Sequence, residues 1–202
     1  FCVLVASNKA LTVVDPRDQY QARVRILDWY ERQSPADFHL YGRGWERPAA
    51  LPGRWDRVRN QLRKILARFL TAKSPYATWR GPVDDKIELL TRARFCLAHE
   101  NCRDLAGYVT EKLFDCFRAG CVPVYVGPKE IADLVPAGCF IDGRAFATPA
   151  ELDAFLRTID DAAYRGYQER IRTFLLSDGA KPFSQDHFAD VIAREILADL
   201  AA

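Results

Sequence analysis

The hydrophobic residues of this chain change their spacing repeatedly from strand-like to helix-like. Short apolar runs at 1–6, 37–41, 94–98 and 121–126 predict buried strands. Longer segments between and after them carry apolar residues three and four positions apart, which predicts helices packed on the strands. Such alternation is typical of a parallel sheet covered on both faces. We therefore expect an α/β fold, with a Rossmann-like parallel sheet flanked by helices, in a single domain spanning 1–202.

Capping residues predict where several helices begin and end. Asp15–Pro16 and Thr148–Pro149 each combine an N-cap residue with a proline suited to the first helical position, so the helices starting there should end near Gln33 and Ile159. Gly120 should end another helix, which follows the N-cap residue Thr110. The other expected elements are a strand at 140–141, helices at 83–93, 111–119, 128–137, 162–175 and 187–200, and loops at 42–53, 74–82 and 177–184.

A basic, amphipathic segment at 55–73 has two interpretations. Arginines and lysines such as Arg59 and Lys64 alternate there with apolar residues such as Val58 and Leu62. Such a helix could make weak peripheral contact with an anionic membrane surface, or it could pack on the sheet with its charged face in water. The small net charge of the whole chain, +2, favours the packed helix.

Composition narrows the class of protein. The 202 residues are 49% hydrophobic, enough for one well-buried domain, and the net charge of +2 argues against a general nucleic-acid-binding protein. No apolar run approaches the length of a membrane span, and no signal peptide is visible. Because the chain starts with Phe1 and contains no methionine, we expect a fragment or a processed form. Its expected location is the cytoplasm, either free or peripheral to the inner membrane, or the Golgi lumen if the parent is eukaryotic.

The cysteines and histidines show no spacing typical of a metal site. The six cysteines lack CxxC spacing and most fall in apolar segments, so buried thiols are expected, although their even number leaves disulfides open. Of the three histidines, His99 is expected to be a structural residue with its nitrogens hydrogen-bonded, and a role in ligand binding is the alternative. No Asp-x-Asp triplet is present to hold a metal-bridged diphosphate. We therefore expect no required metal or other cofactor.

The stretch from Arg94 to Gly127 carries the candidate chemistry. A strand, a polar loop, a short helix and a second strand make a βαβ unit, and ligands of parallel sheets bind beyond the carboxyl ends of the strands. Helix N–H groups and an ammonium suit phosphate oxygens, a tyrosine ring can stack on a base, and a carboxylate can accept ribose hydroxyls. The polar residues at that place are Glu100, Asn101, Tyr108, Glu111 and Lys112. They predict a nucleoside diphosphate site, with a merely solvated helical turn as the alternative.

The same stretch resembles the donor-binding motif of a known family. Its sequence ENCRDLAGYVTEKLFDCFRAGCVPVYVG is similar to that of the fucosyltransferases of glycosyltransferase family 10, of the α-1,3/4 type. In that family an E-N pair ends a strand, Y-[VI]-T-E-K opens the next helix, and A-G-x-V-P-V-x-x-G follows. The match continues through Phe140, Ile141 and Asp142 to Phe146. The resemblance implies the C-terminal, donor-binding half of a two-domain transferase with the GT-B fold.

The resemblance also implies a reaction and a set of residues that carry it. The family transfers L-fucose from GDP-fucose, with inversion, to a glycan hydroxyl, commonly on N-acetylglucosamine. Lys112 and Arg23 would act as the catalytic residues of this half by stabilising the leaving GDP. The general base would come from the N-terminal acceptor domain, which we do not expect within this chain. The implied donor-binding residues are Ser7, Asn8, Arg23, Glu100, Asn101, Tyr108, Thr110, Glu111 and Lys112.

The choice of Arg23 rests on a second feature of the family, an S-N pair that ends a strand and an arginine on the following helix that reaches the donor phosphates. Ser7–Asn8 matches the pair, but Arg23 lies 15 positions after Asn8, farther than in some members. Arg17 and Arg25 therefore remain competitors. For each of the three arginines, a solvated helix face is the alternative.

Two other functions stay open on the sequence alone. One is a nucleotide-binding or nucleotide-sugar-binding module without catalysis. The other is a GT-B transferase that uses a different donor sugar. The expected partners are GDP-fucose and a glycan acceptor, with no nucleic acid.

Overall fold

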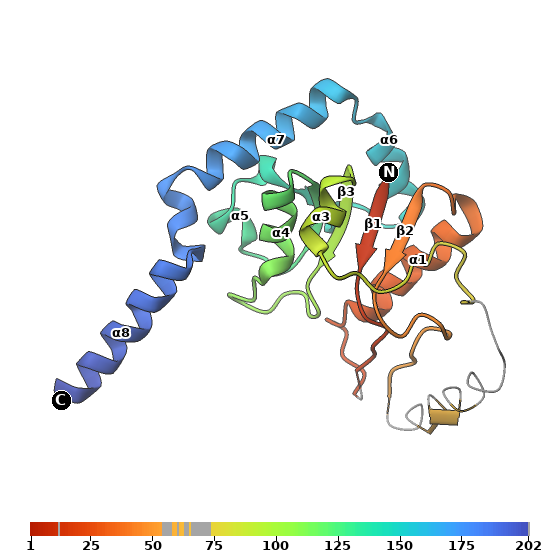
Figure 1. The fold of residues 1–202 in the computed structure, drawn as a ribbon, viewed down its shortest axis with the longest axis horizontal. Coiled ribbons are helices and arrows are strands. Elements are labelled where there is room, and N and C mark those ends of the chain that lie inside the picture. Colours follow the sequence, from red (N-terminus) through yellow and green to blue (C-terminus); the bar gives the residue numbers. More distant parts are fainter. Residues whose placement is uncertain (12, 54–57, 60, 63–64, 66–73, 202) are drawn as a thin grey trace.

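Five parallel strands form the sheet at the centre of the protein (Figure 1). The computed structural model describes residues 1–202 except 12, 54–57, 60, 63–64, 66–73 and 202. The strands are β1 (Cys2–Val5), β2 (Phe38–Tyr41), β3 (Phe95–His99), β4 (Val122–Val126) and β5 (Ile141–Asp142). Their order is β2-β1-β3-β4-β5, and each neighbouring pair is parallel. The direction of the connections reverses between β1 and β3, which is where ligands of such sheets bind.

Helices cover both faces of this sheet. The described α-helices are α1 (Tyr20–Gln33), α3 (Lys86–Thr91), α4 (Glu111–Ala119), α5 (Ile131–Leu134), α6 (Pro149–Thr158), α7 (Asp161–Leu175) and α8 (Gln185–Ala201), and the 3₁₀ segments are η1 (Ala137–Cys139), η2 (Gly143–Ala145) and η3 (Asp178–Phe183). The connections β1-α1-β2 and β3-α4-β4 run in opposite directions across the sheet. Because such crossovers are right-handed, α1 and α4 lie on opposite faces. α6 packs with α1, and α3 and α7 pack with α4 (Figure 1).

The central strands are buried on both faces, as their continuous apolar runs require. Every residue of β3 and β4 is buried. The core extends to Leu27 and Tyr30 of α1 on one face and to Leu113 and Phe117 of α4 on the other. The predicted α/β fold, a parallel sheet flanked by helices, is therefore confirmed.

The predicted start of α1 is wrong. The helix begins at Tyr20, not at Pro16. Asp15 caps only a local turn, because its carboxylate accepts a hydrogen bond from the N–H two residues later. The backbone of residues 17–19 instead pairs with that of residues 101–103. A continuous helix could not make this contact, so a tertiary pairing overrides the local capping signal.

Other boundaries agree more closely with the predicted ones. α4 has Thr110 as its N-cap, with the hydroxyl facing the N–H of Lys112, and it ends at Gly120 with a left-handed φ of 71°. α6 and α7 start within one residue of their predicted positions. The helix expected at 128–137 is the shorter α5, the strand at 140–141 is shifted by one residue, and the expected loop at 177–184 contains η3.

Two regions at the periphery carry no part of the sheet. The helix expected at 55–73 lies largely outside the described residues, so its membrane contact stays a prediction; residues 58–59, 61–62 and 65 are described and helical. At the other end, α8 extends away from the sheet and contacts η3 (Figure 1). Within the described part of the chain, no helix is long and apolar enough to cross a lipid bilayer.

Candidate functional site

A buried carboxylate lies at the end of β3. Glu100 follows the strand directly and is completely buried. Its oxygens accept hydrogen bonds from Lys112 Nζ at 2.9 Å, from Thr110 N and Oγ1, each at 2.8 Å, and from Tyr125 OH at 3.2 Å. A buried carboxylate is tolerated only with such partners. Glu100 therefore fixes the first turn of α4 and its lysine, and it would act on a ligand through them.

Lys112 is held from two sides at the N-terminus of α4. Its Nζ lies 2.9 Å from Glu100 Oε2 and 2.9 Å from Thr110 Oγ1, and 18% of its side chain stays exposed. Thr110 is also the N-cap of α4. The same partners thus fix both a helix N-terminus and an ammonium group, two features that attract an anion.

Arg23 reaches the same edge of the sheet from α1. Only 5% of the residue is exposed. Its Nε donates to Gln19 O at 3.2 Å and its Nη2 donates to Asn101 Oδ1 at 3.1 Å. Burial lowers the pKa of Arg23, and the nearby Tyr20 and Glu100 oppose that shift. Because arginine stays protonated in proteins, a fixed positive charge lies beside Asn101.

Arg23 and Lys112 converge from opposite faces of the sheet. Both border one small cavity of about 10 Å³, which Val5 and Ala98 also line. A cavity of this volume holds one water molecule at most. Glu100 offsets the charge of the lysine, but the arginine is met by the neutral Asn101. The arrangement leaves positive charge at the carboxyl ends of β1 and β3, which suits a diphosphate.

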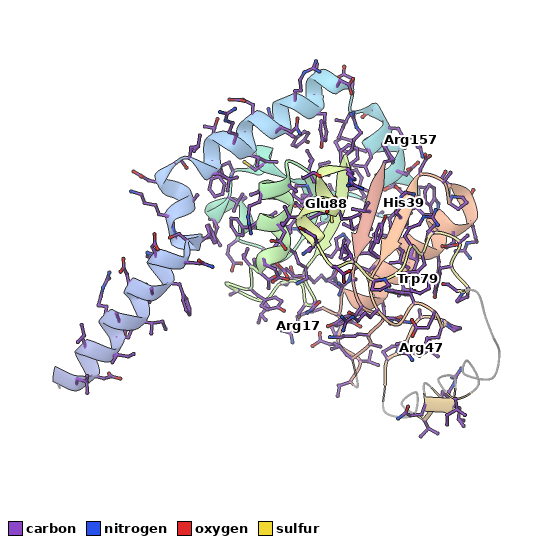
Figure 2. The ribbon with its side chains drawn as sticks, in the orientation of Figure 1. Arg17, His39, Arg47, Trp79, Glu88 and Arg157 are labelled. Atoms are coloured by element: carbon purple, nitrogen blue, oxygen red, sulfur yellow. The ribbon has the colours of Figure 1, made fainter. Side chains whose placement is uncertain are left out.

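The two competing arginines lie elsewhere. Arg17 is exposed and pairs with Asp15 at 2.9 Å. It lies at the end of the molecule where the strands finish, whereas Arg157 lies at the opposite end (Figure 2). Arg25 is exposed on α1 and lines a separate cavity. The geometry therefore favours Arg23 as the arginine of the predicted site.

Asn8 organises a loop rather than presenting a free amide. Its Nδ2 donates to Gly44 O at 2.8 Å and to Pro48 O at 3.1 Å, and its Oδ1 accepts from Ala50 N at 2.7 Å. These hydrogen bonds hold the segment after β2 against the end of β1. Asn8, predicted among the donor-binding residues, would therefore shape the site through this loop.

Ser7 is exposed and lines a cleft of about 430 Å³ beyond the ends of β1 and β2. Arg43 and Val83 form other parts of its wall. Val5 borders both this cleft and the cavity between Arg23 and Lys112, so the two are neighbours. Neither Arg43 nor Val83 could be selected from the sequence, because Arg43 lies in a stretch recognisable only as a loop and Val83 at the start of a predicted helix.

Tyr108 and Glu111 have side chains that are accessible to solvent. Tyr108 is partly exposed and lies near Arg23 and Tyr125, since it slightly opposes the lowering of the Arg23 pKa and adds slightly to the raised pKa of Tyr125. Glu111 is exposed in the first turn of α4, next to Lys112. Among the described residues, neither side chain forms a hydrogen bond or ion pair. The structure thus brings together most of the predicted residues at one edge of the sheet.

The histidine and cysteine expectations have different outcomes. All six cysteines are free thiols, and five of them are buried. The expectation of a hydrogen-bonded His99 is wrong, because neither ring nitrogen has a partner. Burial, together with the charge of Arg23, lowers the pKa of His99 to about 3. Within the described residues, no group of three or more His, Cys, Asp or Glu side chains is arranged to hold a metal ion.

Comparison with known proteins identifies the family. Residues 55–186 match the model of the C-terminal part of glycosyltransferase family 10 (fucosyltransferase). The chain belongs to glycosyltransferase family 10. It is 36% identical over 94 residues to an alpha-(1,4)-fucosyltransferase of Arabidopsis thaliana, covering 46% of this chain and 23% of that protein. It is also 36% identical over 100 residues to alpha-(1,3)-fucosyltransferase 7 of Mus musculus, covering 46% of this chain and 25% of that protein.

Solved structures show the same fold in this family. The crystal structure of an alpha1,3-fucosyltransferase with GDP-fucose superposes with a TM-score of 0.52 at 20% identity, covering 83% of this chain and 38% of that chain. The same kind of enzyme with GDP gives a TM-score of 0.53. The predicted architecture, the C-terminal half of a GT-B fold, is thereby confirmed. This chain spans about a quarter of the length of the two relatives and less than half of the solved enzymes.

Proposed function

We propose that residues 1–202 form the donor-binding domain of a fucosyltransferase. The domain binds GDP-fucose, and the complete enzyme transfers L-fucose with inversion to a glycan hydroxyl, such as one on N-acetylglucosamine. The observation that carries the proposal is the pair of fixed cations, Arg23 beside Asn101 and Lys112 beside Glu100, at the point where the sheet order reverses. Membership of glycosyltransferase family 10 supports it.

The two cations stabilise the leaving group in this proposal. When the bond from fucose to GDP breaks, negative charge develops on the diphosphate. Arg23 and Lys112 are held by their own hydrogen bonds before any ligand arrives, so little reorganisation is needed as the charge grows. Their positive charge supplies what a metal ion supplies in other nucleotide sites, and the proposal needs no metal or other cofactor.

The nucleoside occupies the groups beside these cations. The exposed carboxylate of Glu111 accepts the ribose hydroxyls, and the Tyr108 ring contacts the nucleotide by stacking. The neighbouring cleft at Ser7 has room for a base. Guanine presents two acceptors, O6 and N7, on one edge, which suits a guanidinium such as that of Arg43. This arrangement favours guanine over a pyrimidine.

Nucleotide preference tests the proposal directly. We expect calorimetric titration of the chain to give at least about 10-fold tighter binding for GDP than for UDP, the equivalent of one or two hydrogen bonds of about 1 kcal/mol each. GDP-fucose should bind in the same site and compete with GDP. Equal affinity for GDP, UDP and ADP would point to a transferase or binding module with another donor, and lack of binding to all three would remove the proposed site.

The assignment of the arginine has its own test. Arg23→Gln keeps a polar side chain beside Asn101 but removes the charge, so GDP affinity should fall by about 10- to 150-fold, which corresponds to 1.5–3 kcal/mol for a charged hydrogen bond. Guanosine, which lacks the phosphates, should lose little affinity, and this comparison also reports whether the pocket is intact. Arg17→Gln is the control, since Arg17 is exposed and paired with Asp15. A larger loss of GDP binding in the control would reassign the phosphate contact.

A further inference from the structure

A second cavity, of about 270 Å³, lies between α1 and α6. Its walls come from the start of α1, the ends of β3 and β4, η2 and the start of α6. The polar residues that line it are Gln19, Arg25, His99, Arg103, Arg144 and Thr148. Neither Arg23 nor Lys112 is among the lining residues. This cavity is therefore a different place from the proposed donor site.

His99 forms part of the buried wall of this cavity with both of its ring nitrogens unpaired. Only 4% of the residue is exposed, and neither nitrogen has a hydrogen-bond partner. Its Nε2 faces Gly143, another lining residue. A Cβ placed on Gly143 would lie 3.4 Å from this nitrogen. A buried polar group without a partner is costly and calls for an explanation. An imidazole that stays neutral offers a ligand one N–H donor and one nitrogen acceptor.

Three guanidinium groups surround the same cavity. Arg25 and Arg103 are exposed, and among the described residues Arg25 has no hydrogen bond or ion pair. Two carboxylates are close to the other arginines. Asp142 pairs with Arg144 at 2.8 Å, and Asp104 lies 3.7 Å from Arg103. Among the described residues no ion pair offsets the charge of Arg25, so this guanidinium remains available to an anion.

We propose that this cavity is a second ligand site, which takes a small phosphorylated molecule that also carries hydroxyl groups. The phosphate meets Arg25 and Arg103, and a hydroxyl reaches the unpaired nitrogens of His99. A guanidinium suits phosphate geometrically, and the neutral imidazole suits a hydroxyl, which both donates and accepts. The volume of about 270 Å³ fits a molecule much smaller than a nucleotide sugar.

The backbone pairing of residues 17–19 with 101–103 separates the two sites. Gln19 lines the second cavity, while its backbone N–H donates to Asn101 O and its carbonyl accepts from Arg23 Nε. The second ligand thus contacts a residue that holds the donor-site arginine, without occupying the donor site. Binding at one site should leave the other open.

Nuclear magnetic resonance of labelled histidine side chains tests the proposal. The chain has three histidines, so His39 and His187 serve as internal controls. We expect inorganic phosphate and glycerol 3-phosphate to shift the His99 resonances in a saturable way, with glycerol 3-phosphate binding tighter and glycerol alone without effect. The shifts should persist with saturating GDP. Displacement of phosphate by GDP, or no saturable shift with either phosphate compound, would overturn the proposal.

Matched variants connect the signal to individual side chains. Arg25→Gln should raise the Kd for phosphate by about 10-fold or more, while Arg118→Gln, an exposed arginine at the end of α4, should leave it unchanged. His99→Phe replaces the imidazole by another planar aromatic ring that lacks both nitrogens, so it should abolish the preference for glycerol 3-phosphate over phosphate, read from the amide of Gly143. GDP affinity should be unchanged in Arg25→Gln. Equal effects of Arg25→Gln and Arg118→Gln would show non-specific charge attraction and refute the site.

Discussion

Replacing Glu100 with glutamine is expected to lower the free energy of unfolding by about 3 kcal/mol, the cost typical of breaking a buried ion pair by removing one partner. Glutamine has the same size, so the change tests charge and hydrogen bonding rather than volume. Its amide nitrogen would face the hydrogen-bond donors of Lys112 and Thr110, which the carboxylate now accepts. Urea unfolding of the chain without nucleotide measures the effect.

The neighbouring carboxylate provides the control. Glu111→Gln makes the same chemical change in the first turn of α4, but at an exposed residue without a partner among the described side chains. Its stability should therefore stay close to that of the parent chain. If Glu100→Gln were as stable as Glu111→Gln, the Glu100–Lys112 pair would contribute nothing to the fold, and Lys112 would lack the fixed position on which the proposed leaving-group stabilisation depends.

The elements that could be predicted are those whose signals are local. The β3-α4-β4 unit follows from an apolar run, a threonine N-cap and a glycine in the left-handed conformation, all within a few residues of the boundaries that they set. The start of α1 was missed for the opposite reason. Asp15 and Pro16 form a good local start signal, but residues 17–19 pair with 101–103, and that pairing is invisible in either segment alone.

The candidate site shows the same division. Asn101 and Arg23 are 78 positions apart, so residue types alone could not indicate that they form a hydrogen bond. Only the resemblance to a family could suggest that they lie at the same site. The sequence suggested that Glu100 binds the ligand directly. In the structure it is completely buried and forms an ion pair with Lys112. His99 lies in a run of buried strand residues, so nothing in the sequence indicated that both of its nitrogens would remain unpaired beside a cavity.

The isolated chain is expected to bind GDP-fucose but to transfer fucose at close to the background rate. Inverting transfer requires a base that takes the proton of the acceptor hydroxyl on the side of the sugar away from GDP. Glu100 cannot serve, because it is completely buried and holds Lys112 and Thr110. Glu111 is exposed, but it lies in the same helical turn as Lys112, the lysine proposed to bind the phosphates, and therefore on the proposed donor side.

Loss of a positioned general base typically reduces a rate by about 10²–10⁴, and loss of the acceptor surface removes the orientation of the hydroxyl as well. Transfer to an N-acetylglucosamine-containing glycan, measured by release of GDP, should therefore be near background for this chain. It should rise by at least about 100-fold when an N-terminal acceptor domain is supplied in the same polypeptide. Efficient transfer by the chain alone, abolished by Glu111→Gln with GDP-fucose still bound, would instead place the base on α4.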